Sequence, residues 1–291
     1  MKEKIKKAVI PVAGFGTRLL PATKSQPKEM LPIVDKPAVQ YVVEEAAQSE
    51  IEDLLFVTGR GKRAIEDYFD YAVELETELE LKEKFDLLEQ VRSVCEKIKI
   101  YYVRQKMARG LGDAVYQAKD FIDGEPFAVL LADDIIDSVK PALLQMIEKF
   151  EACERSILLV MKVPISDSVH YGMIQAKKIS EGFYEVEDLI EKPEAIESPS
   201  NLAIVGRYIL TPAIFDLISR TSEGKGGEIQ LTDSIRGLLA KEKVYAYEFE
   251  GQRFDVGEKL GFLMANISFA LKREDLGKDL KEYLKKLLES L

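Results

Sequence analysis

The sequence is poor in the residues that several common enzyme classes require. It contains a single histidine, His170, and no GxSxG or HExxH motif, so neither a hydrolase triad nor a zinc protease site can be assembled. We expect His170 to have a structural role. The two cysteines, Cys95 and Cys153, have no CxxC partner, and isolated thiols are typical of core packing in a reducing cytoplasm rather than of a disulfide scaffold.

Long apolar runs and an excess of positive charge are also absent. No uninterrupted apolar run approaches the roughly 18 residues that a membrane-spanning helix needs. Lys and Arg total 41 against 51 Asp and Glu, and the net charge of -10 offers no general basic field to a nucleic acid backbone. With 46% hydrophobic and 32% charged residues, the composition is that of a globular protein. We therefore expect no membrane or nucleic acid partner, and any anionic ligand must be held by local cations.

Short apolar runs alternate with helical segments in the first half of the chain and predict a largely parallel sheet. These runs lie at 8–13, 54–58, 98–103, 127–132 and 156–163. They are apolar throughout, as expected when helices cover both faces of a sheet. Shorter alternating segments near 172–176, 183–190 and 203–210 favour antiparallel pairing in the second half. The pattern predicts a doubly wound α/β core with its ligands beyond the carboxyl ends of the strands.

Two segments look like additions to this core. Residues 74–97 are rich in Glu, Lys and Leu, and the spacing of their apolar residues favours an amphipathic helix over a strand. The tail carries a stripe of apolar residues on one helix face, namely Leu276, Leu280, Tyr283, Leu287 and Leu291. This stripe either packs on the core of its own chain or forms a subunit contact.

The segment at 8–37 carries the strongest local signal, because a strand runs into a glycine-containing turn that is followed by Arg18 and Lys28. Glycines let backbone N–H groups approach phosphate oxygens or a base edge, and both cations can neutralise a polyphosphate. A dinucleotide-binding fingerprint needs a third glycine where this chain has Leu19, and a Walker A loop also fails to match. Four prolines between 21 and 37 predict an extended loop over the site.

Here the sequence resembles the sugar nucleotidyltransferases, and in particular their uridylyltransferase branch. The motifs that carry the resemblance are GxGTR at 14–18, PKEMLP at 27–32, DKP at 35–37, VRQKMARGLGDAV at 103–115, LLADD at 130–134, HYGMI at 170–174, EKP at 191–193, SNLAIVGRYIL at 200–210, GGEIQLTD at 226–233 and FDVG at 254–257. They cover nearly the whole chain in the order expected for that family.

The resemblance implies an α/β protein with a Rossmann-like three-layer α/β/α nucleotidyltransferase fold and a mostly parallel mixed central sheet. Residues 1–257 would form the catalytic domain, with a helical insertion at about 74–97, and 258–291 a C-terminal helical tail. The implied reaction joins UTP to glucose 1-phosphate and yields UDP-glucose and pyrophosphate, with Mg²⁺ as cofactor and a homodimer or homotetramer as the assembly. A thymidylyltransferase that uses dTTP and a non-catalytic sugar-nucleotide sensor are the alternatives.

Two aspartates are the candidate metal ligands. Asp133 ends a buried apolar strand, where a bare carboxylate is costly unless it is paired or binds a metal, although it could instead cap the following segment. Asp134 should face elsewhere because neighbouring side chains in a strand alternate, and we do not assign it to the metal. The resemblance makes Asp255 a second metal ligand, although an aspartate before Gly257 could also simply form a turn.

The remaining site residues follow from the resemblance. Catalytic contacts to phosphate are assigned to Arg18, Lys28 and Lys192, and Pro193 should keep Lys192 extended. Contacts to the sugar are assigned to Gly172, Glu191 and Gly206. Contacts to the nucleotide are assigned to Ala13, Gly14, Glu29, Gln105 and Gly110, since a glutamine offers the donor and the acceptor that uracil needs. The alternatives are a surface ion pair for Glu191 with Lys192 and a strand end for Gln105.

Overall fold

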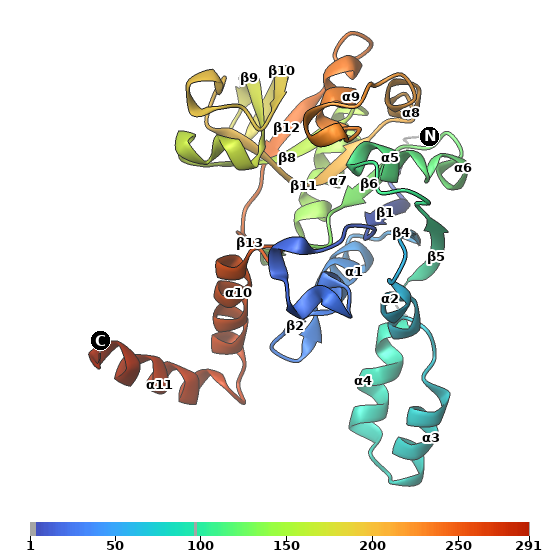
Figure 1. Ribbon diagram of the computed structural model, residues 1–291, viewed down its shortest axis with the longest axis vertical. Helices are drawn as coiled ribbons and strands as arrows, with labels where there is room; N and C mark the ends of the chain where they lie inside the picture. Colours follow the sequence, from blue (N-terminus) through green and yellow to red (C-terminus); the bar gives the residue numbers. More distant parts are fainter. Residues whose placement is uncertain (1–3, 96–97, 291) are drawn as a thin grey trace.

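The computed structural model describes residues 4–95 and 98–290, and its largest element is a twisted nine-stranded sheet (Figure 1). The strands lie in the order β5 (Lys99–Arg104), β4 (Asp53–Thr58), β1 (Lys7–Pro11), β6 (Phe127–Leu130), β11 (Leu202–Leu210), β8 (Ile157–Lys162), β12 (Tyr245–Glu248), β10 (Phe183–Glu191) and β9 (Gly172–Ser180). The first half of the sheet is thus built from the apolar runs that predicted strands.

Parallel pairing dominates only one half of this sheet. Strands β5, β4, β1 and β6 run parallel to one another, whereas β11 is antiparallel to β6 and β8, and β10 is antiparallel to β9 and β12. Strand β12 runs parallel to β8. The predicted mixed α/β fold is confirmed. The alternating pattern expected for 203–210 is wrong, because all nine residues of β11 are buried at the centre of the sheet.

Helices cover both faces, so the predicted three layers are present. One face is covered by α1 (Ala38–Gln48), α2 (Arg63–Tyr68) and α7 (Ala142–Cys153), and the other by α5 (Leu111–Tyr116), α6 (Lys119–Ile122), α8 (Ile214–Ile218) and α9 (Leu231–Leu238). Side chains alternate along a strand, so Val9 of β1 joins the core under α5 and α9, and Ile10 joins the core under α1 and α7.

Two helical pairs project from the body (Figure 1). The segment predicted as one amphipathic helix forms two, α3 (Val73–Leu81) and α4 (Phe85–Cys95), separated by a turn with Glu83 at a φ of 55°. Residues 96 and 97 of that prediction lie outside the described residues. None of the helices in the described ranges is long and apolar enough to cross a membrane.

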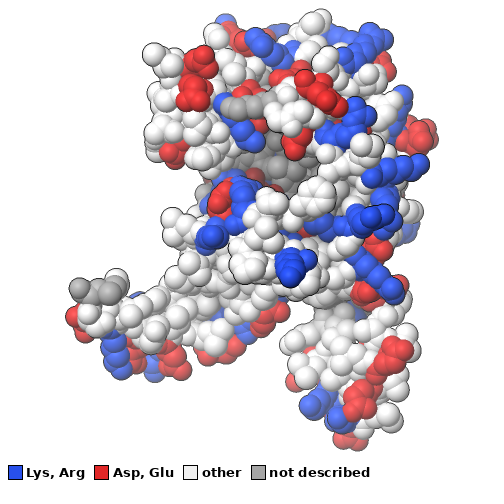
Figure 2. Space-filling model, in the orientation of Figure 1, with Lys and Arg blue, Asp and Glu red and all other residues white. Residues whose placement is uncertain are grey.

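The second pair, α10 (Lys259–Lys272) and α11 (Gly277–Glu289), forms an arm whose surface is largely uncharged on the side seen in Figure 2. Many of its large apolar side chains are exposed: Leu260, Leu263, Met264, Ile267, Leu271, Leu276, Tyr283, Leu287 and Leu288. Of the described members of the predicted stripe, only Leu280 is half-buried, so most of the stripe does not pack on the core of its own chain. Leu291, its last member, lies outside the described residues.

Short elements complete the fold. A ribbon of β7 (Asp134–Asp137) and β13 (Gln252–Asp255) sets Asp134 opposite Asp255. Strands β2 (Pro32–Ile33) and β3 (Lys36–Pro37) pair with each other, and 3₁₀ turns lie at Thr17–Leu19, Ala22–Lys24, Lys28–Met30, Ile165–His170, Ala195–Glu197 and Lys225–Gly227. The proline-rich stretch thus contains turns and short strands instead of an α-helix until Ala38, as predicted.

Candidate active site

The site lies where the strand order of the parallel half reverses. From β1 the chain continues to β4 and β5 on one side and returns to β6 on the other, so the crevice beyond the carboxyl ends of β1 and β6 is the expected ligand position. The loop after β1 carries Arg18 and Lys28, and the turn after β6 carries Asp133. With β9, β10, α9, β13 and α10, these segments enclose a cavity of about 920 Å³, visible as a hollow in Figure 2.

Asp133 is the carboxylate at the centre of the cationic part of this cavity. Lys28 Nζ lies 2.5 Å from its Oδ2 and Arg18 Nη2 lies 3.5 Å away. Burial acts to raise the pKa of the Asp133 carboxyl, but the charges of Lys28 and Arg18 outweigh it and hold that pKa below its ordinary value. Arg18 also pairs with Glu258 at 2.5 Å, so it joins the loop after β1 to the start of α10.

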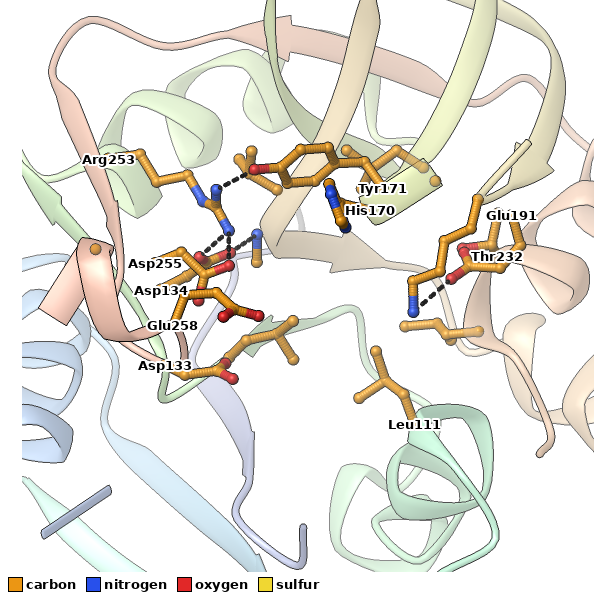
Figure 3. Close-up of a pocket in the computed structure, with 18 of the residues that line it drawn as sticks. Leu111, Asp133, Asp134, His170, Tyr171, Glu191, Thr232, Arg253, Asp255 and Glu258 are labelled. Atoms are coloured by element: carbon orange, nitrogen blue, oxygen red, sulfur yellow. Dashed lines mark hydrogen bonds and ion pairs between the residues drawn. The ribbon is translucent and has the colours of Figure 1, made fainter. Parts of the chain in front are cut away.

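A second carboxylate pair is organised by Arg253 (Figure 3). Its guanidinium donates to Asp134 and lies 3.4 Å from Asp255 Oδ2, while Nη1 donates to the Tyr171 hydroxyl at 3.0 Å. The same guanidinium stacks over the Tyr171 ring at 5.2 Å from its centroid. Burial, and then the charge of Asp134, raise the pKa of Asp255 despite Arg253. We call Asp133, Asp134, Asp255 and Arg253 the acidic wall.

The surroundings of Gly257 test whether the acidic wall suits a divalent cation. A Cβ on this glycine would lie 2.7 Å from Arg18 Nη2, 2.9 Å from Asp133 Oδ2 and 3.1 Å from Asp255 Oδ1. Two carboxylate oxygens and one guanidinium nitrogen thus converge beside this glycine. Among the described residues there is no group of three or more His, Cys, Asp or Glu side chains that could hold a metal. One or two carboxylates completed by phosphate oxygens and water is the environment that Mg²⁺ prefers, so the residues fit it.

The opposite wall of the cavity consists of Gly172, Glu191, Lys192 and Thr232, and we call it the sugar wall after the contacts predicted for Gly172 and Glu191. The Thr232 hydroxyl donates to Glu191 Oε2 at 2.6 Å, and Lys192 Nζ lies 3.5 Å from Glu191 Oε1. The prediction that Pro193 keeps Lys192 extended is wrong, because Lys192 has a φ of 46°. Its backbone N–H donates to Tyr171 O at 2.9 Å. Such strain is often found where a side chain must be aimed at a ligand.

The residues predicted to bind the nucleotide lie beside this cavity rather than in its lining. Ala13 and Gly14 follow β1, and Gly110 directly precedes Leu111, which lines the cavity. The Gln105 side chain donates to Gly110 O at 3.2 Å and to Asp113 Oδ2 at 2.7 Å, so it shapes the turn that follows β5.

Glu29 is the most enclosed of these predicted residues. It is 2% exposed and accepts a hydrogen bond of 2.7 Å from Lys62. Burial outweighs the attraction between the two groups, so it raises the pKa of Glu29 and lowers the pKa of Lys62. Among the atoms described, the Glu29 carboxylate is thus committed to an internal partner, and its contact with a base stays a prediction.

Close packing against Asp134 explains why position 206 is a glycine, which the sequence alone did not reveal. Its N–H donates to Asp134 Oδ2 at 2.7 Å, and a Cβ would lie 2.5 Å from the same oxygen. Any other residue would push Asp134 out of the acidic wall. The contact of Gly206 with a sugar stays a prediction, although the residue does line the cavity.

Comparison with known proteins agrees with this geometry. A family model for nucleotidyl transferases matches residues 7–270. The chain belongs to the nucleotidyl transferase family. It is 54% identical to the UTP–glucose-1-phosphate uridylyltransferase of Staphylococcus epidermidis over 98% of this chain and 99% of that one. It is 55% identical to a second such enzyme from Staphylococcus saprophyticus over 98% of both chains.

Solved structures support the same family. A UTP-bound UGPase from Acinetobacter baumannii superimposes on this nucleotidyl transferase with a TM-score of 0.90 and 41% identity, and covers 97% of this chain and 99% of that one. A UDP-glucose pyrophosphorylase complexed with UDP-glucose gives a TM-score of 0.85 and 44% identity, with 92% and 100% coverage.

Several residues of this nucleotidyl transferase site escaped prediction. Asp134, expected to face elsewhere, lines the cavity, because Asp133 lies in a turn and strand alternation does not apply to it. His170, expected to be structural, is exposed in the lining. Arg253 could have been found, since it lies two positions before Asp255 on one strand and must share its face. Nothing in the sequence except the motifs that contain them indicated that Tyr171 and Thr232 line the site.

Proposed function

We propose that this nucleotidyl transferase joins UTP to glucose 1-phosphate and releases pyrophosphate, with UDP-glucose as the product. The observation that carries the proposal is that one cavity is lined by Arg18 and Lys192, the cations predicted to bind phosphate, and by the candidate metal ligands Asp133 and Asp255. Support for the substrates comes from relatives at 54% and 55% identity that are uridylyltransferases, and from similar structures that hold UTP or UDP-glucose.

The reaction is an in-line displacement. A phosphate oxygen of glucose 1-phosphate attacks the α-phosphorus of UTP, the bond to the β-phosphate bridge breaks, and pyrophosphate leaves with the electron pair. No general base is needed because the attacking phosphate is already ionised. Two anions must meet, so the chain contributes mainly position and charge: Arg18 and Lys28 from the loop after β1, and Lys192 from the sugar wall.

Asp133 and Asp255, whose oxygens converge beside Gly257, would hold Mg²⁺ together with phosphate oxygens and water. The ion would supply positive charge to the phosphates of UTP. Lys28 and Arg18 pair with Asp133, so these cations lie beside the carboxylate that would hold the ion. Asp134 takes no part, because Arg253 and the Gly206 N–H occupy its carboxylate.

The two ends of the substrates are proposed to bind on different segments. Ala13, Gly14, Glu29, Gln105 and Gly110 would surround the base and ribose of UTP. Glu191 would accept hydrogen bonds from sugar hydroxyls, with Gly172 and Gly206 beside it. The phosphates would then lie between the acidic wall and Lys192, in the same cavity as Arg18.

The larger organisation is proposed as follows. Residues 1–257 form the catalytic domain, in which α3 and α4 are an insertion, and 258–291 form the C-terminal helical tail. The exposed apolar side chains of α10 and α11 favour a subunit contact, and we propose a homodimer or homotetramer. Two isolated cysteines suit work in the cytoplasm.

The proposal is tested by measuring pyrophosphate release from UTP, dTTP, ATP and GTP, each paired with glucose, galactose and mannose 1-phosphates. UTP with glucose 1-phosphate should give the highest turnover. Clear preference for dTTP would identify a thymidylyltransferase. Absence of pyrophosphate with every pair, together with binding of UDP-glucose, would identify a non-catalytic sensor. The Asp133→Asn variant, purified in the same way, controls for contaminating activity.

A further inference from the structure

A buried arginine at the centre of the sheet has a complete set of acceptors around it. Arg207, in β11, is 0% exposed and is the largest fully buried side chain in the described part of the chain. Nε donates to both Glu45 oxygens at 3.1 Å, Nη2 to Glu45 Oε2 at 2.6 Å and to Asp134 O at 2.8 Å, and Nη1 to Gly206 O at 2.9 Å and to Leu131 O at 3.2 Å. All five N–H donors of the guanidinium are therefore used.

Glu45 ties this arginine to the helical layer. It lies in α1, is 8% exposed, and its Oε1 also accepts a hydrogen bond of 3.0 Å from the backbone N–H of Leu143 in the first turn of α7. A carboxylate at the N-terminus of a helix is favoured by the orphan N–H groups there. The pair thus joins the central strand to two helices on one face of the sheet.

Two of the three backbone carbonyls that Arg207 binds lie on either side of Asp133. Leu131 O lies two residues before it and Asp134 O one residue after it, and the turn is closed by a bond of 3.3 Å from Asp134 N to Leu131 O. One rigid guanidinium therefore holds both ends of the turn that presents Asp133. The pair has no contact with the substrate cavity of its own, since neither residue lines it.

We infer that Arg207 and Glu45 are positioning residues that fix the Leu131–Asp134 turn and so set the Asp133 carboxylate for the metal. The role of the metal in this inference rests on the proposed function. The effect of Arg207 and Glu45 on the rigidity of the turn is independent of that function. Only a planar guanidinium with several N–H donors can reach both carbonyls and Glu45 at once. A lysine ammonium cannot replace it. Mutation of the groups that hydrogen-bond to a metal ligand and orient it typically lowers metal affinity by about 10-fold to 100-fold.

The test compares Arg207→Lys and Glu45→Gln with Ile218→Ala, a core variant in α8 whose side chain lies away from the cavity lining. Ile218 is 2% exposed, so Ile218→Ala should also destabilise the fold and reports on loss of stability alone. All variants are studied at a temperature where each is folded. Three quantities are measured: hydrogen exchange of the turn at 131–134 in the metal-free chain, Mn²⁺ affinity in the presence of UTP by electron paramagnetic resonance, and the Mg²⁺ concentration for half-maximal rate.

Arg207→Lys should speed exchange in the turn and weaken Mn²⁺ binding about ten-fold or more, with Glu45→Gln intermediate. The half-saturating Mg²⁺ concentration should rise in parallel, while the KM for glucose 1-phosphate stays within about two-fold, because the sugar wall is untouched. Ile218→Ala should leave all of these quantities near their original values.

Wild-type turn protection and wild-type Mn²⁺ affinity in a folded Arg207→Lys chain would overturn the inference. If neither single variant folds, the double variant Glu45→Leu with Arg207→Met removes both charges together, which a core can tolerate. It should show the same weakened Mn²⁺ binding. If that variant also fails to fold, the pair is a folding determinant and the positioning role is rejected. Failure of the proposed function would instead appear as a wild-type chain without uridylyl transfer.

Discussion

The two walls of the cavity are built from different interactions. On the acidic wall, Asp133, Asp134 and Asp255 all lie within 4 Å of a cationic nitrogen, supplied by Lys28, Arg18 or Arg253. On the sugar wall, Glu191 is held by the Thr232 hydroxyl and lies 3.5 Å from Lys192 (Figure 3). The acidic wall thus carries several paired charges, whereas the sugar wall combines one ion pair with a hydrogen bond from a hydroxyl.

This contrast separates the tasks of a single cavity. Densely paired charges stabilise a polyphosphate and an ion, because interactions between full charges are strong where water is partly excluded. Hydroxyl and carboxylate groups instead discriminate between arrangements of sugar hydroxyls. Damage to the acidic wall should therefore lower kcat and change the metal dependence. Loss of a neutral hydrogen-bonding group from the sugar wall should act on the KM for the sugar phosphate, whereas loss of its cation, Lys192, should lower turnover.

The largest effect is expected from Asp133→Asn, which keeps the shape of the side chain and removes its charge. We expect turnover to fall by roughly 10³ or more, since the charge stabilisation that a metal supplies amounts to several kcal/mol. Steady-state rates and thermal melting are measured together. Asp137→Asn is the matched control, because Asp137 pairs with Lys272 outside this cavity. A wild-type rate and magnesium dependence in Asp133→Asn would place the ion on another carboxylate.

The next effect concerns the cation of the sugar wall. Lys192→Ala should lower turnover by roughly 10² to 10³, the usual scale for the loss of one preorganised electrostatic group. The fold should be retained, because the Lys192 side chain is 44% exposed. Lys178→Ala, at an exposed ion pair on β9, serves as the control. If the folded Lys192→Ala chain turns over at a near-normal rate, the residue forms only a surface ion pair with Glu191.

A smaller effect should appear when only a neutral donor is removed from the sugar wall. Thr232→Val leaves Glu191 without its hydroxyl donor, and a net hydrogen bond of about 1 kcal/mol corresponds to roughly a five-fold to ten-fold rise in the KM for glucose 1-phosphate. The half-saturating Mg²⁺ concentration should not change. A shift in magnesium dependence with an unchanged KM for glucose 1-phosphate would contradict the proposal that the two walls have different roles.

The smallest effect on catalysis is expected from the arm. Tyr283→Glu with Leu287→Glu places two charges in the exposed apolar stripe of α11 and should convert a homo-oligomer to a monomer, with turnover within about two-fold. Light scattering measures the mass, and Lys285→Glu, on the other side of α11, is the control. A wild-type chain that is already monomeric at micromolar concentration would leave the stripe without a partner.

Much of the fold could be predicted from the sequence because its strands are strongly apolar and regularly spaced. The parallel half, its helices and the proline-rich loop follow from local patterns and were confirmed. Strand β11 could not be recognised as central, because burial on both faces depends on its neighbours β6 and β8. The break between α3 and α4 was equally hidden, since it depends on one residue, Glu83, in a left-handed conformation.

The site was predicted less completely, for a physical reason. Motifs indicated which residues belong to the site, and the cavity brings together Arg18, Asp133, Glu191, Lys192 and Asp255. Ion pairs between distant segments could not be predicted from the sequence, above all Arg253 with Asp134 and Arg207 with Glu45. Such pairs depend on tertiary packing that joins residues up to 162 positions apart. The backbone of Lys192 also departs from what Pro193 favours, because the surrounding structure overrides the local preference.

A substitution at Gly257, which lies beside Asp133 and Asp255, allows the most direct test of the acidic wall. Gly257→Ala would put a methyl group between Asp133 and Asp255, with Arg18 Nη2 2.7 Å from it. Gly237→Ala, where the nearest atom is 3.5 Å away, is the matched control. We predict that Gly257→Ala weakens Mn²⁺ binding and raises the half-saturating Mg²⁺ concentration by at least about ten-fold, with the KM for glucose 1-phosphate nearly unchanged. Wild-type metal affinity in the folded Gly257→Ala chain would contradict the assignment of the ion to this wall.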